Sequence, residues 1–174
     1  MGGSDPISNV VRFVLLLFVQ VILFRQVSLG LGGAASLAII VSPLFIALLP
    51  LRTPLPLVVV FSFLLGFGTD LFYESLGVHM AAATFTGYAR QFVLRLLEPR
   101  DGFKVKASPE GRDLGFSWWM KYVGMMLGVY LIWYFSMEAF SPVFWRSIAL
   151  KTVVSLPVSW VVCMVFVTLL RPRI

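Results

Sequence analysis

Apolar runs of membrane-spanning length recur along this chain and constrain its fold more than any other feature. A transmembrane helix needs about 20 mainly apolar residues. With 59% hydrophobic residues, 13% charged residues and a mean hydropathy of +0.93, the chain has too little polar surface for a water-soluble domain. We therefore predict an all-α membrane protein whose 174 residues form a single bundle of six transmembrane helices. The expected spans are residues 7–24, 34–51, 55–69, 78–97, 119–137 and 147–170.

The residues between and within the runs predict how the helices connect. Pro43 lies inside the second run and predicts a kinked helix, because proline has no amide hydrogen to donate. Residues 52–56 are a tight connection between adjacent helices. The first run also has the character of a signal-peptide core, but further spans follow, so we interpret it as a retained helix. Residues 98–118 are the only sizeable polar stretch, for which we predict a loop outside the membrane.

Residues 61–100 predict a helical hairpin with acidic residues at one end and basic residues at the other. We expect its first helix to end on Gly66, Gly68 and Asp70, and its second to leave through Arg95. Such asymmetry between two spans sets a direction across a membrane. The hairpin therefore carries information about orientation.

The distribution of basic residues predicts the topology. Most of the 14 Lys and Arg residues fall on the side of the N-terminus, in the loop at 98–118 and in the C-terminal tail. The positive-inside rule then places both termini in the cytoplasm. The net charge of +6 arises from residues that flank apolar segments, which favours contact with membrane lipids over nucleic acid.

Asp70 and His79 are the first candidates for chemistry, and Glu74 shares a face with Asp70 if the helix continues. An Asp near a His can act as a general base, a proton relay or a ligand pair. The simpler interpretation is that Asp70 caps a helix end or accepts a hydrogen bond from His79. No serine or cysteine nucleophile pattern accompanies the pair, and one His is poor material for a metal site. We predict a protein that is not an enzyme, with no catalytic residue, metal or cofactor.

Arg90 lies about two turns before the predicted cytoplasmic end of the fourth span. Its side chain either snorkels to the interface or has a buried partner, which would be an acidic group of another subunit or a lipid phosphate. Gly66, Gly68 and Gly87 let helix backbones approach closely, within the chain or against a partner helix. The candidate partner-binding residues are Gly66, Gly68, Asp70, His79, Gly87 and Arg90.

Three short strings in the sequence resemble a known family. They are GFGTDLF at 66–72, LGVHMAA at 76–82 and EPRDGF at 98–103. They resemble the rod shape-determining MreD family, particularly its Bacteroidetes-type members. The resemblance covers most of the chain, including Gln20 in the first span, and its motifs are most specific between residues 66 and 103.

This resemblance implies a non-enzymatic subunit of the machinery that elongates the bacterial cell wall, located in the inner (cytoplasmic) membrane. Members of the family are associated with MreC and, through it, with the RodA glycosyltransferase, a class B penicillin-binding transpeptidase and the MreB filament. The implied fold is similar to that of the substrate-binding components of energy-coupling factor transporters. On this hypothesis, the third and fourth spans offer a small-residue groove to the transmembrane helix of MreC.

Two other classes of function remain open. A small-molecule-binding component of a transporter predicts a polar central pocket and an energising partner, and the few intramembrane polar residues argue against it. An intramembrane enzyme needs a paired nucleophile and base at depth, which we do not find in the sequence.

Overall fold

The computed structural model describes residues 6–24, 38–74, 77–99, 103, 115–140 and 145–170, and throughout these ranges the regular structure is helical. The all-α prediction is confirmed for this part of the chain. Two of its helical segments, Leu55–Tyr73 and Trp145–Thr168, are long and apolar enough to cross a membrane. The elements are α1 (Pro6–Val19), the π-helical turn η1 (Gln20–Phe24), α3 (Ser42–Leu48), α4 (Leu55–Tyr73), α5 (Val78–Leu96), α6 (Phe116–Ala139) and α7 (Trp145–Leu170).

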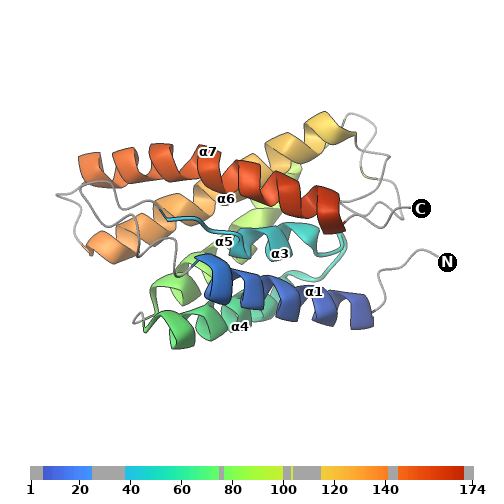
Figure 1. Cartoon of the computed structure of the whole chain (residues 1–174). Helices are drawn as coiled ribbons and strands as arrows, with labels where there is room; N and C mark the ends of the chain where they lie inside the picture. The colour runs from blue at the N-terminus through green and yellow to red at the C-terminus, as the bar shows by residue number, and fades with distance from the viewer. Residues whose placement is uncertain are drawn as a thin grey trace.

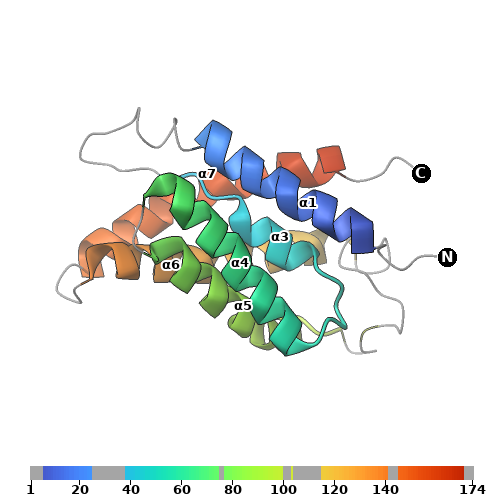
Figure 2. The same cartoon turned by 90° about the horizontal axis from the view of Figure 1, so that it is seen from below.

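The short helix α3 lies in the middle of the bundle, with α4 and α7 on opposite sides of it (Figures 1 and 2). Every residue of α3 is buried. The helices around it are therefore organised about an interior helix much shorter than themselves. The start of α1 and the end of α7 lie at the same end of the bundle (Figures 1 and 2).

The predicted second span is wrong within the described residues. Residues 38–41 are not helical, and α3 begins only at Ser42 and ends at Leu48. Pro43 lies in the first turn of α3, where its missing amide hydrogen costs nothing, so it starts the helix and does not kink it. Seven residues of helix rise only about 10 Å, much less than a bilayer core. Residues 34–37 lie outside the described part.

The helix α4 is longer than the sequence predicted. It passes through Gly66, Gly68 and Asp70, continues to Tyr73, and ends where Glu74 takes a left-handed conformation with φ 55°. The prediction of an end at the glycines and Asp70 is therefore wrong. The glycines do not break α4 because close packing against its neighbours offsets their weak helix propensity.

The remaining helices agree with the predicted spans to within a few residues. The helix α5 ends at Leu96, α7 begins at Trp145, and α6 begins at Phe116, inside the predicted loop at 98–118. This early start of α6 has a visible cause, because the indole Nε1 of Trp118 donates to the carbonyl oxygen of Leu97, 2.7 Å away. The bond ties the first turn of α6 to the end of α5.

Candidate functional site

Asp70 of α4 caps the N-terminus of α5. Gly77 occupies the N-cap position with φ 82° and has no side chain to accept from the first amides of α5. The Asp70 carboxylate does so in its place: Oδ1 accepts from the amide of His79 at 3.0 Å, and Oδ2 from that of Met80 at 2.8 Å. A negative charge there also favours the positive end of the helix dipole. One side chain thus closes the hairpin between α4 and α5.

His79 completes this contact and is itself enclosed by aromatic rings. Its Nδ1 lies 3.0 Å from Oδ1 of Asp70, and an ionised carboxylate only accepts hydrogen bonds, so Nδ1 is the donor. The Tyr73 and Tyr134 rings lie 4.8 and 4.9 Å from the imidazole, centroid to centroid. His79 is 2% exposed and Asp70 7%. Both versions of the simpler interpretation, a helix cap and a bond from His79, are present together.

Gln20 of η1 binds the non-helical segment that leads into α3. Its Oε1 accepts from the amides of Val41 and Ser42, and its Nε2 donates to the carbonyl oxygen of Ile39 at 3.2 Å. Tyr73 in turn donates to the backbone carbonyl of Gln20 at 3.0 Å. Backbone outside a helix must find such partners when it is buried away from water. Gln20 therefore makes the non-helical backbone before α3 tolerable on one side.

A row of small polar side chains on α7 satisfies the same segment from the other side. Ser155 accepts from the amide of Ala38, and Ser159 accepts from the amide of Ile40 at 3.1 Å while donating to the carbonyl oxygen of Ala38. The thiol of Cys163 lies 3.8 Å from the carbonyl oxygen of Ile40. Residues four apart lie on one face of a helix, so α7 presents a polar stripe to the segment. The serine and cysteine stripe is a signal that sequence reasoning missed.

Arg90 of α5 is buried, so the snorkelling alternative is wrong and the buried alternative holds with different partners from those expected. Its side chain is 3% exposed, and its Nε donates to the Tyr122 hydroxyl of α6 at 3.0 Å. Its Nη2 donates to the carbonyl oxygens of Leu49 and Pro50, which follow the end of α3. Each carbonyl oxygen carries a partial negative charge, so the two together hold the guanidinium inside the bundle. Arg90 links α5, α6 and the exit from α3.

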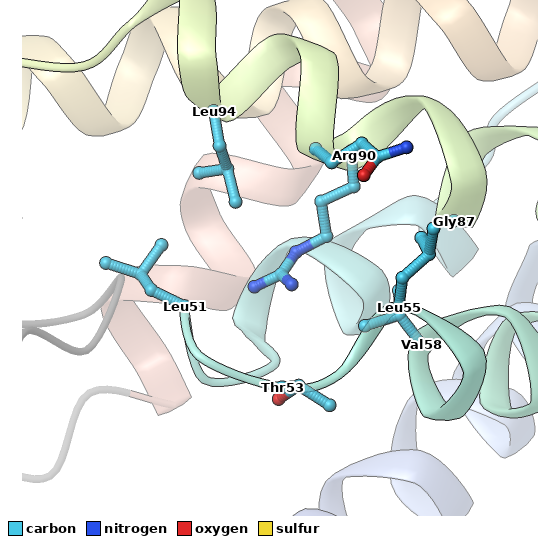
Figure 3. Close-up of a pocket in the computed structure, with 8 residues that line it drawn as sticks. Leu51, Thr53, Leu55, Val58, Gly87, Arg90 and Leu94 are labelled. Carbon is cyan, nitrogen blue, oxygen red and sulfur yellow. The ribbon is translucent and has the colours of Figure 1, made fainter.

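A cavity of about 140 Å³ adjoins the Arg90 guanidinium. Figure 3 shows the side chain running from α5 into the space framed by Leu51, Thr53 and Leu94. The volume is close to the roughly 150 Å³ of an engineered cavity that takes benzene. The lining residues are Leu51, Thr53, Leu55, Val58, Gly87, Arg90, Gln91 and Leu94.

The three candidate glycines lie in contacts within the chain. A Cβ on Gly66 would lie 2.5 Å from the Cα of Met80 in α5, and a Cβ on Gly87 would lie 2.8 Å from the Cβ of Ser62 in α4. Gly68 faces a side chain of α1, where its Cβ would meet Leu17 Cδ1 at 2.7 Å. Gly66 and Gly87 thus bring α4 and α5 together. Of the two alternatives for small residues, the structure contains packing within the chain.

The candidate residues therefore form two groups. Gly66, Asp70 and His79 meet at the turn of the hairpin, while Gly87 and Arg90 line the cavity farther along α5. Gly68 belongs to neither group. Among the described residues, no cluster of three or more His, Cys, Asp and Glu side chains is placed to hold a metal ion. Comparisons with protein-family models, curated proteins and solved structures found no match for this chain.

Proposed function

We propose that this protein is a non-enzymatic, six-span subunit of the bacterial cell-elongation machinery in the inner membrane, with both termini cytoplasmic. It binds MreC and through it helps to organise lateral peptidoglycan synthesis by RodA and a class B penicillin-binding transpeptidase along MreB. The observation that carries the proposal is the resemblance of residues 66–103 to the MreD family.

The roles of the residues in the resembling strings support this proposal. Gly66 and Asp70 come from the first string, and His79 and Met80 from the second; in the structure these four residues fasten α4 to α5. A hairpin fixed by backbone contact and by a buried carboxylate is a stiff platform. A stiff platform suits a subunit that holds other proteins in place.

The packing of the glycines moves the expected MreC contact to another face. The α4–α5 contact is filled, so a partner helix has to bind on the outer side of the hairpin. The side chains of Phe63, Phe67 and Leu71 on α4 are 42%, 46% and 64% exposed there. We propose this face of α4 as the MreC contact.

Site-specific photocrosslinking in cells that express MreC tests the proposal. A photoreactive residue at Phe63 or Phe67 is expected to crosslink to MreC. The same residue at Val153 or Val161 of α7, which are 68% and 55% exposed, serves as the matched control on the opposite side of the bundle. Crosslinks from α7 alone would move the contact to α7, and no MreC crosslink from either helix would remove the proposed function.

One observation favours the alternative, a small-molecule-binding component of a transporter. Non-helical backbone at membrane depth, such as residues 38–41 before α3, often forms the binding sites of transporters. In this chain the freed backbone groups are bonded to Gln20, Ser155 and Ser159. A small molecule that co-purifies and is lost on Gln20→Ala substitution, together with absence of MreC crosslinks, would favour this alternative.

A further inference from the structure

We propose that the cavity beside Arg90 binds a phosphate group, supplied by an anionic phospholipid. This inference needs membrane insertion but does not depend on MreC or on any assembly.

Arg90 has N–H donors that the described part of the chain does not use. A guanidinium has five N–H donors, and the three bonds from Nε and Nη2 leave the two donors of Nη1. Nη1 makes no hydrogen bond to any residue in the part of the chain that the structure describes. Nη1 is not among the fully buried polar atoms that lack a partner, so it is open to the cavity that Arg90 lines, and a ligand there can accept from it.

The positive charge of Arg90 is not neutralised within the described part of the chain. The partners of Arg90 are a hydroxyl and two carbonyls, all formally neutral, and no described carboxylate lies within ion-pair distance of it. A buried cation without a counter-ion carries a large desolvation cost. Phosphate oxygens match the guanidinium fork better than any other common anion of a membrane. An anionic ligand would therefore neutralise the charge that the chain leaves uncompensated.

The lining and the position of the cavity also suit a phospholipid headgroup. Thr53 and Gln91 supply polar groups beside Arg90, while Leu51, Leu55 and Leu94 line the rest with apolar surface. This division suits a phosphate with apolar carbon attached. The cavity adjoins the turn before α4 and the last turns of α5, at the end of the bundle where α1 begins (Figure 2). Basic residues gather at the predicted cytoplasmic ends of the spans, where anionic headgroups also concentrate.

Thermal unfolding in uncharged detergent micelles tests the proposal with three ligands. They are phosphatidylglycerol, the diacylglycerol with the same acyl chains but no phosphate, and inorganic phosphate. We expect phosphatidylglycerol to raise the Tm of the full chain and diacylglycerol to have no comparable effect. A rise with inorganic phosphate equal to that with the phospholipid would keep the phosphate site and assign it to a soluble ligand.

Two substitutions on α5 identify the residue responsible. Arg90→Gln is expected to raise the phosphatidylglycerol concentration needed for half the Tm shift about tenfold or more, which corresponds to the loss of a charge-assisted hydrogen bond. Arg95→Gln removes the same charge from an exposed position on the same helix and is expected to leave that concentration within about twofold. Equal losses in both variants would overturn the proposal, because they would reflect surface charge alone.

A second pair of variants keeps the test open if Arg90→Gln fails to fold. Gln91 lines the cavity, and its side chain makes no hydrogen bond to a described residue. Gln91→Glu places a negative charge beside the guanidinium and is expected to abolish the phosphatidylglycerol shift, whereas the uncharged Gln91→Leu keeps most of it. If neither phosphatidylglycerol nor inorganic phosphate protects the wild-type chain, or if Gln91→Glu retains the full shift, the proposal is wrong.

Discussion

Asp70→Ala removes the carboxylate that fastens α4 to α5, and we expect it to lower the free energy of unfolding by about 2–4 kcal/mol. The substitution leaves the His79 and Met80 amides and the His79 imidazole without their acceptor. A buried donor left without a partner costs about 1–3 kcal/mol. Loss of a single helix cap costs about 0.5–2 kcal/mol in other proteins. We expect a value above that range because Asp70 is only 7% exposed.

Reversible unfolding in micelles, followed by far-ultraviolet circular dichroism, measures this loss. Asp70→Asn keeps one side-chain oxygen as an acceptor, so we expect it to cost about half as much. Glu98→Ala removes an exposed carboxylate beyond the end of α5 and serves as the control, with an expected change below about 0.5 kcal/mol. If Asp70→Ala is no more destabilising than Glu98→Ala, the carboxylate does not hold the hairpin together.

Other substitutions test the packing and the non-helical segment before α3 in the same assay. Gly66→Ala is expected to cost about 2–3 kcal/mol, because the new methyl group meets the backbone of Met80 at 2.5 Å and a backbone cannot rotate away. Gly68→Ala is expected to cost less than about 1 kcal/mol, because the methyl group meets only the end of the Leu17 side chain and alanine is the better helix former. Equal costs at the two glycines would refute this distinction. Gln20→Leu leaves three backbone partners unsatisfied and is expected to cost at least about 3 kcal/mol. Gln20→Glu is expected to cost less because it keeps the acceptor oxygens. A leucine variant as stable as the wild type would contradict this prediction.

Hydropathy predicted the long helices well because helices that avoid water consist mainly of apolar residues, which are visible in the sequence. The same signal failed at residues 34–51, which are as apolar as a span but include α3, a helix of seven residues. Hydropathy reports that a segment avoids water and says nothing about whether its backbone bonds internally. Residues 38–41 can stay non-helical because Gln20, Ser155 and Ser159 of other helices accept hydrogen bonds from their amides.

The candidate site divides in a similar way. The bond between Asp70 and His79 was predictable because nine residues with a turn between them bring the two side chains together. The sequence left the burial of Arg90 open and did not predict its partners, which are backbone carbonyls after α3 and a tyrosine on α6. Every residue has a backbone carbonyl, so the sequence does not show which carbonyls accept hydrogen bonds from an arginine. The choice between the two alternatives for this cation was therefore made by groups that only the folded chain assembles.

The contact between α7 and the segment before α3 has a consequence for how this chain is made. The amide of Ala38 binds a serine 117 residues later, and that of Ile40 binds one 119 residues later. A nascent chain leaves the ribosome from its N-terminus, so this segment emerges long before its partners exist. Until α7 is translated, those amides need other hydrogen-bond partners. The bonds that complete the segment at 38–41 therefore form only after more than a hundred further residues have been synthesised.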